Sequence, residues 1–145
     1  MKKLLSIAIC AIMILSSVSV FADNGINVTI DGVPMEFTDF YGYPMEQNDR
    51  VLLPFRQIFE TYGWDAFYDD GTESVFGKSG DRYIAMQVGS LDYFSEKGKV
   101  TFDVAPIIVN GRTMVPIRVV SETLGFKVDW DDATRTVIID TTVAQ

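Results

Sequence analysis

An internal repeat constrains the fold of this chain more than any other feature. The sequence aligns with itself without gaps at an offset of 62 residues, so that residues 50–56 (RVLLPFR) match residues 112–118 (RTMVPIR). The two copies span about 40–76 and 102–138. Two copies are too few for an open solenoid. We therefore predict a single domain built from two related halves.

Each copy predicts the same local structure, a short helix between strands. Pro54 and Pro116 suit the first turn of a helix, where the missing N–H group costs no hydrogen bond, which leaves Leu53 and Val115 in the N-cap position. Apolar residues then recur at helical spacing, at Phe55, Ile58, Phe59 and Tyr62 and at Ile117, Val120 and Leu124. In both copies a glycine, Gly63 or Gly125, follows where a left-handed residue would end the helix.

The rest of the chain alternates apolar and polar residues with the period of a half-buried strand. Such strands are predicted around 26–30, 33–37 and 84–88, and after the helices at 64–68, 74–77, 126–130 and 136–139. Many short strands with two short helices indicate the α+β class. We expect short antiparallel or mixed β-strands wrapped around the two helices, in two related halves.

Residues 1–22 have the composition of a secretory signal peptide. Two lysines precede an almost wholly apolar run, and Val20 and Ala22 are small residues suited to signal peptidase. A retained membrane anchor is the alternative, which the shortness of the run disfavours. Cys10 lies well inside the run, which argues against a lipoprotein signal. We expect cleavage after Ala22, a single domain over 23–145, and a secreted, extracytoplasmic or cell-surface location.

The charge of the mature chain argues against two classes of partner. The full chain carries a net charge of −8, and removal of the two signal lysines makes it −10. No basic stripe is present in the sequence, so no nucleic acid partner is expected. An acidic protein is also repelled by an anionic membrane surface, and we expect no membrane association after signal cleavage.

Several of these residues resemble the signature of a known family. The run NGRTMVPIR at 110–118, followed by Glu122, by LGF at 124–126 and by the strand at 128–131, is similar to the core of the copper amine oxidase N-terminal domain-like modules. Residues 50–63 resemble a second, more divergent copy. Such modules are widespread in exported and surface proteins of Gram-positive bacteria. The resemblance implies a non-catalytic, stalk-type domain with a small antiparallel sheet twisted around a helix.

Composition excludes amine oxidase chemistry in spite of that family name. The chain has no histidine, and its one cysteine leaves with the signal. A copper site built on imidazole and the Ser-His-Asp and Cys-His nucleophile systems are therefore excluded. A pair of carboxylates acting on a glycosidic bond is the least favoured alternative. We predict a protein with no enzymatic activity, no cofactor and no metal.

Most of the repeated polar, proline and glycine residues are interpreted as structural: Pro54, Arg56, Glu60, Gly63, Pro116, Arg118, Glu122, Gly125 and Trp130. Each arginine lies four residues before a glutamate, on its own helix. The alternative is a pair of ligand clamps. Because arginine before glutamate is the weaker order for helix pairing, an aspartate of the following strand, Asp69 or Asp131, is also a plausible partner. We expect each arginine to be bound to one of these acids.

Two acidic turns, at 69–73 and 129–132, offer oxygen ligands of the kind that calcium prefers. Neither matches the twelve-residue calcium loop, and aspartates are common in turns for backbone reasons. We interpret both as ordinary turns.

Aromatic residues on loops are the candidate ligand-binding residues. Phe40, Tyr41 and Tyr43 crowd one loop that contains glycine and proline, and Tyr93 and Phe94 are predicted to lie in another. Such aromatic faces bind sugars or a partner protein, and the alternative is that they cover the core.

The favoured function is a non-catalytic extracytoplasmic interaction or structural module that binds a protein or a cell-envelope partner. One alternative is a carbohydrate-binding module that recognises cell-wall polysaccharide through the loop aromatics. Another is an inhibitor or regulator of a secreted enzyme. A dimer formed through strand edges is also open.

Overall fold

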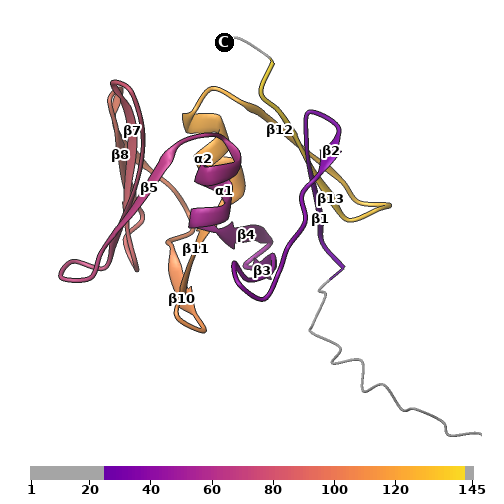
Figure 1. The fold of residues 1–145 in the computed structure, drawn as a ribbon, viewed down its shortest axis with the longest axis horizontal. Helices are drawn as coiled ribbons and strands as arrows, with labels where there is room; N and C mark the ends of the chain where they lie inside the picture. Colours follow the sequence, from indigo (N-terminus) through magenta and orange to yellow (C-terminus); the bar gives the residue numbers. More distant parts are fainter. Residues whose placement is uncertain (1–24, 143–145) are drawn as a thin grey trace, which may run out of the picture.

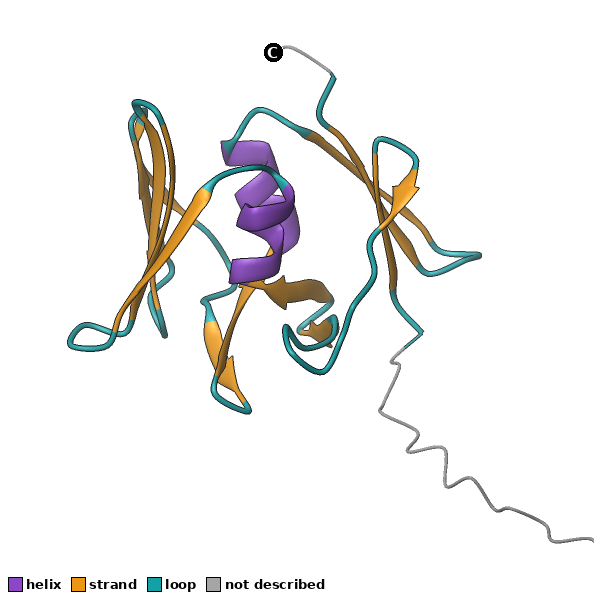
Figure 2. Ribbon diagram, viewed as in Figure 1, coloured by secondary structure: helices purple, strands orange, loops and turns teal. Residues whose placement is uncertain are grey.

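Three β-sheets surround two short helices in the structure, a computed structural model that describes residues 25–142 (Figure 1). The helices α1 (Phe55–Thr61) and α2 (Ile117–Thr123) lie at the centre, and two of the sheets flank them on opposite sides (Figure 2). This arrangement confirms the predicted α+β class. The predicted signal peptide lies outside the described residues, and no helix within them is long and apolar enough to span a membrane.

The central sheet joins the two repeats about an approximate two-fold axis. Its strands follow the order β10 (Ile107–Val109), β11 (Arg112–Pro116), β4 (Arg50–Pro54) and β3 (Met45–Gln47). The inner pair is antiparallel, with Leu53 opposite Val115 and Leu52 opposite Pro116. Leu53 and Val115 are equivalent in the repeat, so the axis passes between them. Both are fully buried, which places the join between the halves in the core.

Each half also contributes to an outer sheet. The first-half sheet has the order β5 (Asp65–Asp69), β6 (Ser74–Ser79), β7 (Arg82–Gln87), β8 (Asp92–Ser95) and β9 (Gly98–Thr101), all antiparallel. The second-half sheet has the order β12 (Lys127–Asp131), β13 (Thr136–Asp140), β1 (Asn27–Ile30) and β2 (Val33–Pro34). Here β1 runs parallel to β13 and takes the place that β7 has beside β6. The N-terminal strand therefore completes the second half.

Both helices end as predicted but begin one residue later. Pro54 and Pro116 are the N-caps rather than first-turn residues, because the strands β4 and β11 extend up to them and their ψ angles are 120° and 115°. At the other end Gly63 and Gly125 have φ angles of +73° and +87°. The N–H groups of each glycine and of the residue after it bind carbonyl oxygens of the last turn, as in a Schellman motif.

One hydrophobic core includes residues of both halves, among them the helical residues Phe55, Ile58, Phe59, Ile117, Val120 and Leu124. At two equivalent core positions, the order of a large and a small residue is reversed between the halves. The Phe59 ring lies against Gly77, and the equivalent positions of the second half hold Ser121 and Ile139. Tyr62 links the halves, because its hydroxyl is hydrogen-bonded to Ser121 Oγ at 2.9 Å.

Candidate functional site

Two grooves of the surface are related by the repeat. Each is formed by the helix start and the following aromatic strand of one repeat and by the β-hairpin of the other, and we name it after the repeat that supplies the helix. The first-repeat groove, of about 470 Å³, is lined by Phe40, Tyr41, Pro54, Phe55, Arg56, Tyr68, Asp70, Glu73, Ile108, Gly111, Arg112 and Thr113. The second-repeat groove, of about 380 Å³, contains the equivalents Pro116, Ile117, Arg118, Trp130, Asp132, Arg135, Glu46, Asp49, Arg50 and Val51.

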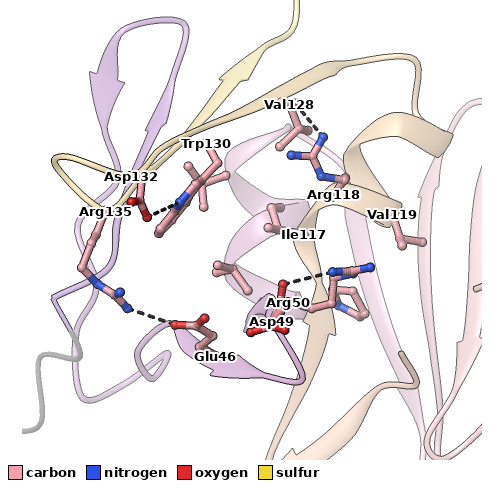
Figure 3. Close-up of a pocket in the computed structure, with 13 residues that line it drawn as sticks. Glu46, Asp49, Arg50, Ile117, Arg118, Val119, Val128, Trp130, Asp132 and Arg135 are labelled. Carbon is pink, nitrogen blue, oxygen red and sulfur yellow. Dashed lines mark hydrogen bonds and ion pairs between the residues drawn. The ribbon is translucent and has the colours of Figure 1, made fainter. Parts of the chain in front are cut away.

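An ion pair bridges the second-repeat groove (Figure 3). Arg135, in the turn between β12 and β13, reaches Glu46 of β3 with Nη2 and Oε2 3.0 Å apart. The Arg135 guanidinium also lies 5.9 Å from the centre of the Trp130 ring, within the range of a cation–π contact. These contacts join the walls of the groove across its opening.

Arg118, the helix arginine of the second-repeat groove, is also held by neighbouring groups. Arg118 Nη1 donates to the carbonyl oxygen of Val128 at 2.9 Å and lies 3.2 Å from Glu122 Oε1. The predicted bond to an acid is therefore present for Arg118, with the helix glutamate, and the further bond is to the backbone of β12 instead of to the side chain of Asp131.

The first-repeat groove has no such bridge. The residues equivalent to Arg135 and Glu46 are Glu73 and Ile108, which cannot form an ion pair. Within the described part of the chain, Arg56 forms neither a hydrogen bond nor an ion pair. The predicted bond between Arg56 and an acid is therefore wrong, because Glu60 Oε2 accepts the hydroxyl of Tyr41 at 2.6 Å instead. This groove is open, and the guanidinium of Arg56 has no ion-pair partner among the described residues.

Aromatic side chains form one wall of the open groove. Phe40 is 77% exposed, and its ring packs edge-on against Tyr41 with the ring centres 4.9 Å apart. Tyr68 and Ile108 are 37% and 42% exposed on the other lining elements. Phe40, Tyr68 and Ile108 together give the groove an exposed apolar lining, and a contiguous apolar patch of this kind is typical of a binding surface.

Arg112 fixes the loop that carries these aromatics. Its guanidinium donates to the backbone carbonyls of Asp39 and Phe40, so β11 of the second repeat holds the loop of the first. Gly42, at φ +100°, lies so close to this arginine that a Cβ atom there would collide with the Arg112 side chain. The loop is therefore held in place before any ligand arrives.

The two tyrosines of the groove remain uncharged at neutral pH. The pKa of Tyr41 is raised, mainly by its hydrogen bond to Glu60. The pKa of Tyr68 is raised by desolvation and then by the nearby carboxylates of Glu73 and Asp70. The groove is therefore lined by neutral tyrosine rings together with two guanidinium groups, Arg56 and Arg112, and two acids, Asp70 and Glu73.

The structure separates the predicted aromatic candidates. Phe40 and Tyr41 line the open groove, whereas Tyr43 lies in the same loop and donates its hydroxyl to Asp39 Oδ1 at 2.8 Å. The prediction that Tyr93 and Phe94 lie in a loop is wrong, because both belong to β8. Tyr93 is only 1% exposed and donates to the carbonyl of Val104, so it is a core residue and no ligand contact. Phe94 is exposed on the outer face of the sheet, outside the groove.

Two residues that line the groove, Tyr68 and Ile108, are not among the ligand-binding residues predicted from the sequence. They come from a strand and a hairpin far from residue 40 in the chain, and each looks like an ordinary strand residue. The repeat alignment carried a usable signal, because it shows that a charge pair present at 46 and 135 is missing at 108 and 73.

The acidic turns use their oxygens for backbone hydrogen bonds. Asp69 Oδ1 accepts the N–H of Gly71, and Asp131 Oδ1 accepts that of Ala133, both at 3.0 Å. Among residues 25–142 no three acidic side chains are grouped so that they could hold a metal ion.

The sequence is similar to one protein family and to a named bacterial protein. Residues 29–139 match the model of the copper amine oxidase N-terminal domain. The chain is also 26% identical over 133 residues to a protein of Brevibacillus choshinensis named "Protease inhibitor". The match covers 87% of this chain and 41% of that protein, so the chain spans less than half the length of its relative.

Proposed function

The chain belongs to the copper amine oxidase N-terminal domain family, a non-catalytic kind of domain, and on that premise we propose that it binds a partner protein in the first-repeat groove. The single observation that carries the proposal is the difference between two equivalent grooves of one molecule. One is bridged by Arg135 and Glu46, and the other is left open with Arg56 unbound. The difference leaves the first-repeat groove accessible, with Arg56 and exposed aromatic residues in its lining.

The lining of the groove describes the segment that would fit it. Phe40, Tyr68 and Ile108 offer apolar contact, and Arg56 offers a charge-assisted hydrogen bond to a carboxylate. A peptide segment with an apolar side chain next to an acidic one satisfies both. Arginine and aromatic residues are also the types that dominate protein–protein binding energy.

Retention of proteins on the immobilised protein tests the proposal. Proteins from the culture medium and the solubilised envelope of the source organism are passed over wild type, Phe40→Ala, Arg56→Ala and the control Arg135→Ala, which alters the equivalent groove. We expect a protein bound by wild type and the control, with affinity reduced roughly tenfold by either groove variant, since one well-placed anchor is worth about 1–2 kcal/mol. Equal retention on all four, or none on any, would contradict the proposal.

Inhibition of a secreted protease is a second candidate, favoured by the name of the Brevibacillus relative. Casein hydrolysis by purified secreted serine proteases and metalloproteases provides the assay. The inhibitor hypothesis predicts a dose-dependent loss of rate with wild type that Phe40→Ala weakens. Full activity of every protease would reject inhibition while leaving the retention experiment to decide on partner binding.

Carbohydrate recognition is the remaining alternative for the same aromatics. A sugar would stack on Phe40 and Tyr68 and would have little need of Arg56. Retention on insoluble cell-wall polysaccharide that Phe40→Ala abolishes and Arg56→Ala leaves unchanged would favour it over a protein partner.

We also propose that the protein acts outside the cytoplasm after removal of residues 1–22. The expected mature product begins at Asp23, and intact mass measurement of the exported protein checks this. A product that keeps the N-terminal segment would show that the segment is an anchor.

A further inference from the structure

We propose that the outer face of the first-half sheet is a contact surface between two copies of this chain. The first-half sheet lies beside the two helices (Figure 1). Its outer face carries one row of residues across all five strands. The register aligns Phe67, Phe76, Ala85, Phe94 and Lys99. The three phenylalanines are 54%, 37% and 49% exposed, so the row forms an apolar band on the surface.

A hollow interrupts the band at its centre. Ala85 is small, and a depression of about 210 Å³ lies over it, with Phe76 and Phe94 on its sides. The opposite face of the same strands is the core, where Val75, Ile84 and Tyr93 are at most 1% exposed. The fold is therefore complete without the outer phenylalanines, and their position requires another explanation.

The row is close to self-complementary about Ala85. A two-fold axis parallel to the strands and passing over Ala85 would place Phe76 of one copy opposite Phe94 of the other, twice. It would also place β5 of each copy over β9 of the other. Such an isologous arrangement is the commonest symmetry of soluble dimers, and two twisted sheets pack well when their strands are nearly aligned.

The charges at the two ends of the row favour this axis. Lys99 of one copy would meet the Phe67 ring of the other, a cation–π geometry. The carboxylate of Asp65 is close by, because Asp65 lies two residues before Phe67 in β5 and therefore on the same face. Lys99 is 55% exposed and has Asp92 of its own chain 3.3 Å away, whereas Asp65 has no ion pair among the described residues. A two-fold axis along the row instead would place Lys99 against its own copy, which is repulsive.

The size of the face sets the expected strength. Five strands of four to six residues cover roughly 400 Å², which is less than the roughly 800 Å² per partner of a standard interface. The net charge, −8 for the full chain and −10 without the two signal lysines, also makes two copies repel. A weak, reversible dimer follows, with a dissociation constant on the order of 100 μM.

Sedimentation at about 0.15 M salt and increasing protein concentration measures this equilibrium. We expect the mean mass to rise from monomer toward dimer as the concentration passes the dissociation constant. Phe76→Lys is expected to abolish the rise, and Phe40→Lys, in the first-repeat groove, is expected to leave it unchanged. A monomer at every concentration, or a dimer that survives Phe76→Lys, would overturn the proposal without bearing on the groove.

A charge exchange tests the axis with two exposed substitutions that leave the core intact. Lys99→Asp and Asp65→Lys each place like charges together in a dimer of identical copies, so each variant alone should associate at least several-fold more weakly than wild type. An equal mixture of the two restores opposite charges at both ends and should form a mixed dimer. Failure of the mixture to associate more strongly than either variant alone would reject the arrangement.

Discussion

At the scale of single residues, the two halves fill equivalent core positions with side chains of different size. Where the first half has a large residue followed by a small one, the second half has a small residue followed by a large one. Phe59 fills the first half because Gly77 leaves room for its ring, and Ile139 fills the second half where the helix offers only Ser121. The two halves therefore keep one backbone with different side-chain arrangements.

Gly77→Ala is predicted to destabilise the protein by about 1–3 kcal/mol, the usual cost of overpacking a core. A Cβ atom at this position would collide with the Phe59 ring. Urea unfolding measures the loss, and Gly71→Ala, whose Cβ would lie 3.4 Å from Asp69 Oδ1, is the control with an expected change of less than about 0.5 kcal/mol. Adding Phe59→Leu to Gly77→Ala should cost less than the sum of the single changes.

Because Tyr62 is partly buried against the core, we predict that the protein loses stability at alkaline pH, where this side chain ionises. Burial raises the pKa of Tyr62 to about 12, against a hydrogen bond with Ser121 that lowers it. The unfolded chain ionises first, near the ordinary pKa of 10.0, so the contribution of Tyr62 is complete below pH 10 and is lost as the pH rises toward 12.

Tyr62→Phe isolates this effect. The variant should be about 1 kcal/mol less stable than wild type at pH 8, because Ser121 loses its partner, and the difference should shrink between pH 10 and 12. Urea unfolding at several pH values measures it. A constant difference over that range would show that the ionisation of Tyr62 is not linked to folding.

At the scale of elements, Arg118 and Arg56 occupy equivalent positions of the two repeats, but within the described residues only Arg118 is hydrogen-bonded to a neighbouring strand. Comparing their alanine variants therefore measures how much that bond contributes to stability. Arg118→Ala should lower the free energy of unfolding by about 1–2 kcal/mol, because Val128 loses a charge-assisted hydrogen bond that joins α2 to β12. Arg56→Ala should cost less than about 0.5 kcal/mol. Thermal and urea unfolding of both variants check this, and equal effects would mean that the difference between the grooves has no energetic content.

The helices were readable from sequence because their signals are local. Apolar spacing and the glycines at 63 and 125 act within one or two turns, and both glycines have the left-handed φ angle that they suggested. The predicted first helix includes Pro54, whereas the observed helix begins at the next residue. The sequence cannot distinguish the two cases, because proline fixes φ at a value that suits both strand and helix. Only ψ distinguishes them, and the pairing of β4 with β11 decides ψ.

At the scale of the whole molecule, the shared central sheet and the main hydrophobic core, which includes residues of both halves, predict that the two halves unfold together. The chain has two tryptophans, and each half holds one: Trp64 is 7% exposed beside α1, and Trp130 is 37% exposed in β12. In Trp64→Phe the fluorescence reports on the second half, and in Trp130→Phe it reports on the first.

Within each variant, the fluorescence transition is expected to coincide with the far-ultraviolet circular dichroism transition in both urea and heat. Separate midpoints in either variant would show that the halves are independent units, in contradiction to the shared core.

The candidate site was only partly readable from sequence for a reason that also belongs to this scale. Phe40 and Tyr41 were visible as loop aromatics, but the groove combines them with the helix of one repeat and the hairpin of the other. That combination depends on the two-fold arrangement of β4 and β11. Tyr93 failed as a candidate because strand burial alternates, and its neighbour Phe94 took the exposed side.

The parallel pairing of β1 with β13 has a consequence for the order of events in folding. It joins segments more than a hundred residues apart, as in the bond from the Asn27 side chain to the carbonyl of Thr134, 107 residues away. The first-half sheet can form from neighbouring hairpins, but β1 has to wait for nearly the last strand to be available. Such distant contacts make closure slow. In a chain that becomes available from its N-terminus, the second-half sheet would therefore close last, after the first-half sheet has formed from its hairpins.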